Sequence, residues 1–279
     1  MSKGSVGPMG RGVAYMRWLA MAAVVLGAPS GLWAAEGMSA RAVMERNYEQ
    51  MQVKDGVYVL EMRIEDQAGR ATVREVRRES YRPRARDEWS LVRFLSPADV
   101  EGTGLLSLED SEGQDDVYLY LPELRKSRRI SGSSNGDYFM GSDFTYKDLR
   151  SERLEANRYE RLTDEVIGGE PCARIVAMPE TEQERTESGY SRREIWVSLS
   201  SWLVVKAEFY DEHGDRVKTL TASDVREVPT EGSGKLRPYA LLMVNHERGR
   251  QTKLTFSSIE LNVGLPTSRF SKRALERAR

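Results

Sequence analysis

Apolar and polar residues alternate along most of the chain, a pattern typical of β-strands with one buried face. In residues 57–66 the apolar positions are Tyr58, Leu60, Met62 and Ile64. The same spacing recurs in residues 116–124, 202–211, 239–247 and 252–261. Turn sequences rich in Gly and Asp separate the segments. About ten or eleven such segments follow one another at short spacing, which predicts a mainly β protein.

Only one helix of any length is predicted. Ser39 can cap its start, and Val43, Met44, Tyr48 and Met51 recur on one face of it. A further helical turn is expected near residues 271–279. Strands and helices do not alternate, so a parallel α/β sheet is not expected. The pattern predicts one large, strongly curved antiparallel sheet with a helix packed against its concave face.

The first 35 residues differ from the rest. Lys3, Arg11 and Arg17 form a basic region, and an apolar run follows at residues 18–26. This run is far shorter than the roughly 20 residues of a membrane-spanning helix. It predicts a cleaved signal peptide at 1–35, export to the periplasm, and a single domain at 36–279. A retained N-terminal anchor is the alternative.

The net charge bears on the partners of the protein, and the cysteine content bears on its disulfides. Removing residues 1–35 takes away three basic and no acidic residues, which leaves 39 basic against 43 acidic ones and a net charge of −4. A mildly acidic exported protein is not expected to bind nucleic acid. Cys172 is the one cysteine. It cannot form an internal disulfide and is expected to be buried in a strand.

Reactive groups are scarce. The chain has two histidines and no metal-protease motif, paired cysteines or phosphate-binding loop. Gly132–Gly136 fits the G-x-S-x-G pattern around Ser134, but basic residues precede it and turn formers follow it, whereas a nucleophile elbow joins a buried strand to a helix. An acidic stretch at 109–116 is interpreted as a solvated turn rather than a calcium loop. The sequence predicts no enzyme, no metal and no cofactor.

The segment 131–149 combines Gly and Ser with aromatic residues. Two interpretations of Tyr138, Phe139 and Met140 stay open. They form a mobile lid or docking tip over an apolar cavity, or they are ordinary core residues of a loop folded down permanently. A basic patch directly precedes the segment, and it either protects a sheet edge or contacts anionic headgroups or an acidic partner protein. It consists of Arg125, Lys126, Arg128 and Arg129.

Several blocks resemble the outer-membrane lipoprotein-sorting protein family, the LolA-like exported proteins. The longest is residues 116–149, and others are 94–106, 193–220 and 259–277. The resemblance implies an unclosed antiparallel β-barrel of about eleven strands, with a helix lidding a hydrophobic cavity. It also implies a periplasmic carrier that moves lipids or lipid-modified proteins between the inner and outer membranes. Partners of this kind are RND-type or MMPL-type inner-membrane exporters. We expect a monomer that contacts membranes transiently.

A curved apolar sheet suits this role, because an acyl chain gains about 0.8 kcal/mol for each CH₂ group that it buries. Inward-facing residues of three segments are the candidates for the lipid-binding cavity, although the same residue types build an ordinary core. A shift of one residue in strand register would exchange the faces. The candidates are Leu60, Met62, Leu119, Leu121, Leu203, Val205 and Phe209. The alternative function is an envelope sensor of lipids or lipoproteins that acts through a partner protein.

Overall fold

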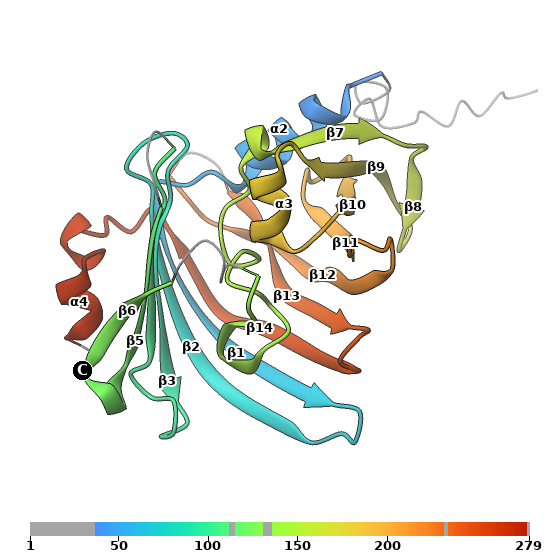
Figure 1. Cartoon of the computed structure of the whole chain (residues 1–279). Helices are drawn as coiled ribbons and strands as arrows, with labels where there is room; N and C mark the ends of the chain where they lie inside the picture. Colours follow the sequence, from blue (N-terminus) through green and yellow to red (C-terminus); the bar gives the residue numbers. More distant parts are fainter. Residues whose placement is uncertain (1–36, 112–114, 131–135, 232–233, 278–279) are drawn as a thin grey trace, which may run out of the picture.

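One strongly curved antiparallel sheet makes up most of the computed structural model, which describes residues 37–111, 115–130, 136–231 and 234–277 (Figure 1). In these residues the sheet has 14 strands in the order β6-β5-β4-β3-β2-β1-β14-β13-β12-β11-β10-β9-β7, with β8 paired to β9. The strands are β1 (Asp55–Asp66), β2 (Ala71–Tyr81), β3 (Trp89–Ser96), β4 (Gly104–Leu108), β5 (Asp116–Leu121), β6 (Lys126–Arg129), β7 (Asn157–Arg161), β8 (Glu165–Ile167), β9 (Glu170–Pro179), β10 (Arg192–Ser198), β11 (Val204–Tyr210), β12 (Arg216–Val228), β13 (Lys235–Asn245) and β14 (Arg250–Leu261).

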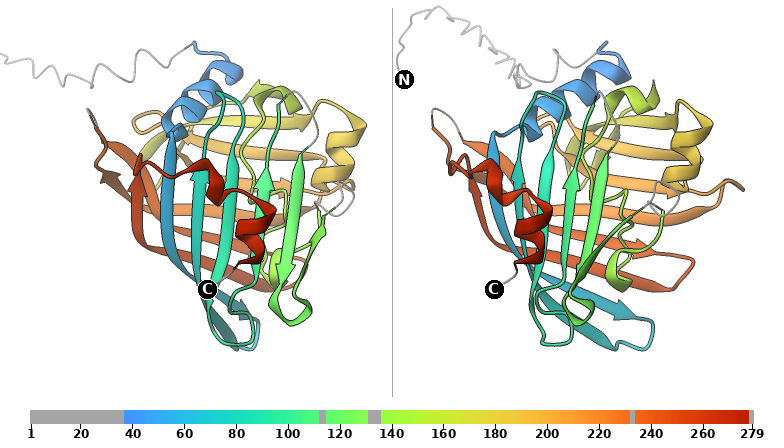
Figure 2. Two further views of the ribbon diagram at one scale, coloured as in Figure 1. Left: turned by 90° about the vertical axis from the view of Figure 1, so that its left-hand side faces the viewer. Right: turned by 60° about the vertical axis from the view of Figure 1, so that its left-hand side comes forward.

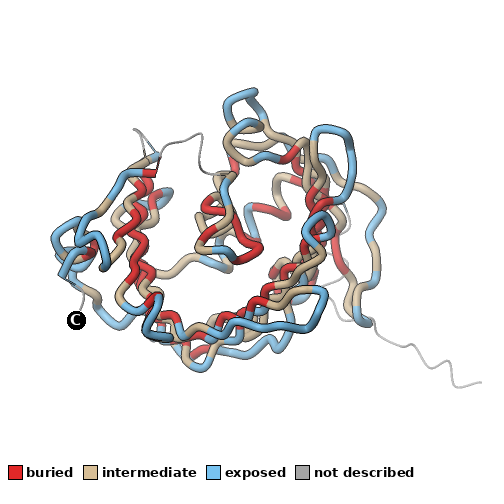
Figure 3. The backbone as a smooth tube through the Cα atoms, turned by 60° about the horizontal axis from the view of Figure 1, so that its bottom comes forward, coloured by how far each residue is buried: buried red, intermediate tan, exposed pale blue. Residues whose placement is uncertain are grey.

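The unclosed half-barrel predicted from the sequence is confirmed. The edge strands β6 and β7 are not paired to each other in the described residues, so the sheet stays open. It has more strands than the eleven expected. The additional ones are short, and β6 and β7 are rich in charged residues, so they lack the apolar alternation that marks the longer strands. Figure 3 shows the sheet as a curved wall, with buried residues along its length and further chain lying within the curve.

Both faces of one half of the sheet are covered. In β4 and β5, Leu105 and Leu119 belong to the main core on the concave side. Their neighbours Leu106 and Tyr120 pack in a separate cluster with Leu275. That cluster lies under the helix α4 (Lys272–Glu276), which rests on the outer side of β4, β5 and β6 (Figure 2). Regular alternation in these strands therefore gives two buried faces instead of one.

The helix α2 (Ala40–Met51) begins where the sequence predicts it. The Ser39 side chain accepts a hydrogen bond from the amide of Ala42. The helix packs near β7, β9, β10 and β13 at one end of the sheet (Figure 1). Its buried Asn47 donates a 2.7 Å hydrogen bond from Nδ2 to the carbonyl of Trp202. None of the described helices is long and apolar enough to cross a membrane. A second α-helix, α3 (Glu182–Ser188), is short and was not predicted.

Four pairs of described strands carry a register shift, and two of these shifts bear on the faces that the sequence suggests. Where β14 pairs with β1, Val59 is opposite Ser258 and Leu60 is opposite Phe256, so Ser257 is an extra residue of β14. Strand β1 itself keeps its alternation, and Tyr58 packs beside Phe256. In the β10–β11 pair the register shifts at Val197, which is opposite Val204. A bulge adds one residue to one strand and changes the side to which the following residues point.

The segment 136–156, which leads into β7, folds back across the concave face (Figure 1). It carries the 3₁₀ turns η3 (Phe139–Gly141) and η4 (Leu154–Ala156), and two further turns, η1 (Pro122–Leu124) and η5 (Thr267–Arg269), flank β5 and α4. We call residues 136–153 the inner loop. Figure 1 shows it in front of β1 and β14, inside the curve of the sheet.

Candidate functional site

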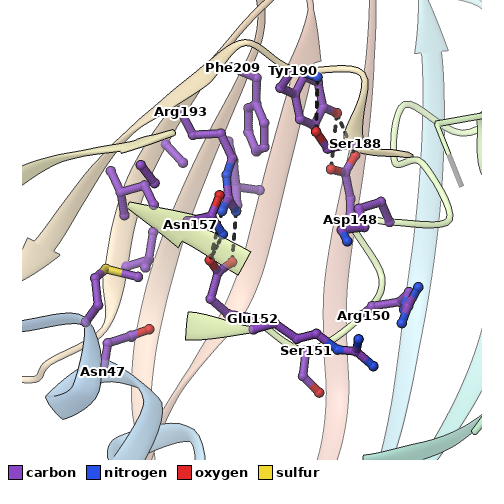
Figure 4. Close-up of a pocket in the computed structure, with 18 of the residues that line it drawn as sticks. Asn47, Asp148, Arg150, Ser151, Glu152, Asn157, Ser188, Tyr190, Arg193 and Phe209 are labelled. Atoms are coloured by element: carbon purple, nitrogen blue, oxygen red, sulfur yellow. Dashed lines mark hydrogen bonds and ion pairs between the residues drawn. The ribbon is translucent and has the colours of Figure 1, made fainter. Parts of the chain in front are cut away.

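A cavity of about 360 Å³ lies on the concave side of the sheet (Figure 4). Strands β9 to β13 form its floor, α2 covers one end, and the inner loop closes one side. Ligand pockets commonly measure 300–1,000 Å³, so this one is at the small end of that range.

The floor of the pocket is apolar. Met44 of α2 faces residues of five neighbouring strands, with Phe209 as the one aromatic side chain that the sheet contributes. These side chains point inward because they occupy alternate positions of their strands. The lining strand residues include Ala177, Ile195, Ala207, Leu220, Leu241 and Met243.

A half-buried ion pair between Glu152 and Arg193 forms the polar wall. The Arg193 guanidinium donates two hydrogen bonds to Glu152, of 2.9 Å from Nη1 to Oε2 and 2.8 Å from Nη2 to Oε1. Tyr159 and Asn157 donate to the same carboxylate at 2.9 and 3.1 Å. Burial opposes ionisation of Glu152, but the Arg193 charge and these hydrogen bonds outweigh it and hold the pKa of Glu152 below its ordinary value.

A second polar group borders the pocket at Tyr190. Its hydroxyl donates to Asp148 Oδ1 at 3.1 Å and accepts a 2.7 Å hydrogen bond from the ammonium of Lys218, which is almost fully buried. Lys218 also pairs with Asp148 at 3.1 Å. Burial, followed by the Asp148 charge, raises the pKa of Tyr190 well above its ordinary value. Tyr190, Asp148 and Lys218 are thus hydrogen-bonded or ion-paired to one another. This arrangement suits a structural role in which they hold the inner loop against β12.

The predicted cavity residues fall into two groups. Leu203 and Phe209 line the pocket. Leu60, Met62 and Leu119 are buried in the main core, and Leu121 packs against it from a partly buried position; none of the four is among the described residues that line the pocket.

Val205 also lies outside the described lining, and Val204 takes its place. The β-bulge between β10 and β11 accounts for this exchange of positions. There Val204 pairs with Val197 and Lys206 with Trp196, so Val205 is the extra residue of the bulge.

The inner loop fills the half of the concave face that the pocket does not occupy. Phe139 is 1% exposed, with its ring centroid 5.6 Å from that of Phe94 and 5.5 Å from that of Tyr146. The Met140 carbonyl accepts a 2.5 Å hydrogen bond from Arg74. Tyr138 accepts one of 2.8 Å from Asn245. Phe139, Phe144 and Tyr146 of this loop are therefore packed into the core in this structure, whereas Tyr138 is only partly buried.

The basic patch lies at the edge of the sheet. Arg125 directly precedes the edge strand β6, which contains the other three residues, and all four are exposed. Arg129 pairs with Asp116 at 2.8 Å. Ser134 lies outside the described residues. Among those that are described, no group of His, Cys, Asp and Glu is placed to hold a metal ion.

No pattern in the sequence indicates the polar wall. Glu152 and Arg193 are 41 positions apart, and each stands in a stretch that is rich in charge. A run of charged residues ordinarily indicates a solvated face, so their pairing inside a pocket appears only in three dimensions.

Comparisons with known proteins support the fold. A family model described only as an uncharacterized protein matches residues 86–277. An outer membrane lipoprotein-sorting protein domain from Vibrio parahaemolyticus is 29% identical over 85% of this chain and 98% of that chain, with a TM-score of 0.79. A DUF1329 family protein from Desulfovibrio piger is 28% identical over 85% of this chain and 97% of that chain, with a TM-score of 0.77.

A more distant likeness shows the same fold. A LolA superfamily protein from Nitrosomonas europaea is 19% identical over 85% of this chain and 99% of that chain, with a TM-score of 0.68. Among curated proteins, no sequence matches the chain.

Proposed function

The chain belongs to the LolA-like family of outer-membrane lipoprotein-sorting proteins, and on this premise we propose that it is a periplasmic carrier of lipids or lipid-modified proteins. The observation that carries the proposal is the pocket on the concave face, which has an apolar floor and a polar wall. An amphipathic molecule needs both, because its chain leaves water and its headgroup keeps hydrogen-bonding partners.

The size of the pocket favours a ligand with one acyl chain as it stands. Each buried CH₂ group stabilises the complex by about 0.8 kcal/mol, so one chain gives useful affinity without any reactive group. Donors and acceptors of the inner loop, among them Lys147 and Ser151, line the same pocket and suit a polar headgroup.

Cargo with more than one chain needs a larger space. We propose that the inner loop moves for such cargo, with Tyr138, Phe139 and Met140 acting as the lid that leaves the concave face. Support for this is that the loop occupies the half of that face between the pocket and β3. Leu60, Met62 and Leu119 would then become part of the cavity.

The remaining parts of the proposal concern export and partners. Residues 1–35, which lie outside the described residues, act as a signal peptide, and residues 36–279 form one half-barrel domain. The carrier takes cargo at the inner membrane from an RND-type or MMPL-type exporter and moves it towards the outer membrane as a monomer. The basic patch supports transient membrane contact through its exposed positive charge. No catalytic step is needed for this function.

Purification from a bacterial periplasm without detergent, followed by native mass spectrometry and lipid extraction, tests the carrier function. We expect a phospholipid, a fatty acid or another acylated species at close to one equivalent. Protein that stays empty even after incubation with lipid vesicles would contradict the proposal and favour a sensing role instead.

A further inference from the structure

The outer side of the sheet carries a second and larger cavity, of about 890 Å³. It lies between β2 and β3 on one side and the η5–α4 segment on the other, on the face that α4 covers in Figure 2. We call it the arginine groove because five arginines line it, against one acidic residue, Glu79, which gives the lining a net charge of +4. The five are Arg77, Arg93, Arg269, Arg273 and Arg277.

Glu79 fixes two of these arginines. Its side chain is only 4% exposed, and Arg269 donates two hydrogen bonds to it, of 2.7 and 2.8 Å. Arg77 donates a third, of 3.0 Å. The guanidinium groups of Arg77 and Arg269 are therefore held in place before any ligand binds. Their contacts with the Glu79 carboxylate show how the groove can bind a carboxylate.

Arg93 also contributes a positive charge. Among the described residues, no carboxylate forms an ion pair with it. Its guanidinium donates to the carbonyls of Ala274 at 3.1 Å and Leu275 at 3.3 Å, at the end of α4. Burial lowers the pKa of Arg93 below its ordinary value, and the nearby charge of Glu79 offsets this only in part. Arg93 thus fastens α4 to the sheet and keeps the floor of the groove positive.

Two exposed arginines at the rim of the groove are available to bind a ligand. Arg273 and Arg277 are exposed, and neither has an ion pair in the described part of the chain. Leu95 adds an apolar spot, with 36% of its surface exposed. On the other side of α4, β6 exposes further positive charge at Lys126 and Arg128. Mutual repulsion among these cations is relieved when a negatively charged partner occupies the groove.

We propose that the arginine groove binds an acidic polypeptide segment of a partner protein. Guanidinium groups match carboxylates in planar, paired hydrogen bonds, and the groove already does this with its own Glu79. A peptide enters a recess between a sheet and a helix, whereas a flat bilayer meets only the protruding side chains. The groove lies on the opposite face of the sheet from the pocket. Docking is therefore possible whether or not the pocket holds a ligand, and the proposal does not depend on the carrier function.

A fluorescent peptide in which Glu and Leu alternate is a suitable probe, read by fluorescence anisotropy against the protein purified from the periplasm. We expect binding that weakens as salt is raised, and no binding of the matching peptide of Gln and Leu. The double variant Arg273→Glu/Arg277→Glu is expected to weaken binding about tenfold or more. The control Lys253→Glu/Arg158→Glu makes the same change in charge on other exposed strand positions and is expected to bind normally.

Three results would overturn the proposal. The first is absence of peptide binding at low salt. The second is equal weakening in both double variants, which would indicate attraction to overall charge and not to the groove. The third is binding to vesicles of anionic phospholipid, lost in the Arg273→Glu/Arg277→Glu variant, without binding of the peptide; the partner would then be a membrane surface.

Discussion

Glu152 of the inner loop and Arg193 of β10 are joined by two hydrogen bonds of 2.8 and 2.9 Å in the wall of the pocket (Figure 4). Their side chains are 26% and 22% exposed, so the pair is largely withdrawn from water. Tyr159 and Asn157 occupy further positions around the carboxylate. This link between loop and sheet fixes the polar edge of a pocket whose floor is apolar.

Replacing Glu152 by Gln is expected to destabilise the protein by about 2 kcal/mol, because the Arg193 guanidinium loses its counter-charge while it stays mostly buried. Urea unfolding at neutral pH measures this. The control is Glu49→Gln, which removes the exposed partner of Arg46 and should cost about 0.5 kcal/mol or less. Equal effects of the two substitutions would show that the pocket pair contributes no more than a surface pair.

The same pair predicts how stability depends on pH. The pKa of Glu152 is lower in the folded protein than its ordinary value, so the folded state binds this proton less tightly than the unfolded state. The stability that Glu152 contributes is present above the unfolded pKa, about 4.3, and is lost as pH falls through the folded pKa. The difference in unfolding free energy between wild type and Glu152→Gln should be full at neutral pH and shrink below about pH 4. If this difference in unfolding free energy instead grows as the pH falls, the pKa of Glu152 is raised and not lowered by folding.

The sequence predicts the faces of the regular strands well. In β5, Leu119 lies on the concave side and Tyr120 on the outer side, as alternation requires. Alternation fails where the backbone carries an extra residue. Ser257 of β14 and Val205 of β11 are the extra residues of two bulges, and nothing in their side chains reveals a bulge. The prediction of fold class does not depend on the position of a bulge, whereas the assignment of a single residue to one face of the sheet does.

The polar parts of both cavities are set by the fold and not by local sequence. Glu79 and Arg269 are 190 positions apart, yet they form a paired contact in the arginine groove. A charged residue in a strand is ordinarily solvated, and only the return of the chain over that strand makes it buried. The apolar inner loop is different, because its aromatic residues in a Gly- and Ser-rich setting do indicate an apolar partner, here the concave face.

Phe139 distinguishes a permanently packed loop from a lid that opens at little cost. The ring lies between Phe94 and Tyr146, so Phe139→Ala is expected to destabilise the protein by about 3–5 kcal/mol if the loop stays packed in the folded state. Urea unfolding of the variant gives this value. A loss below about 1 kcal/mol would mean that the ring already spends much of its time outside the core. Lipid-transfer rates of a variant lacking residues 138–140 then test the lid directly.

Cys172 is expected to be unreactive in the folded protein. It is fully buried in β9, and burial together with the nearby Glu170 raises the pKa of its thiol to about 11. The thiolate that reacts with disulfide reagents is therefore scarce at neutral pH. A chromogenic disulfide reagent should modify no thiol in native protein and one thiol per chain in urea. Rapid modification under native conditions would show that β9 opens readily.

Filling the pocket tests whether it holds the cargo. Ala207 lines the floor in the middle of β11 and is 5% exposed, so Ala207→Trp places a large ring in the space proposed for an acyl chain. Overpacking is expected to cost about 1–3 kcal/mol, which leaves the protein folded. The lipid that co-purifies should fall severalfold by native mass spectrometry.

The matched control is Ala68→Trp, which adds the same ring in an exposed turn and should leave the bound lipid unchanged. Circular dichroism and urea unfolding establish that both variants are folded. If Ala207→Trp is folded and still carries as much lipid as the control, the acyl chain lies elsewhere on the concave face. The region under the inner loop, lined by Leu60, Met62 and Leu119, would then be the site to test next, because it is the other apolar part of that face.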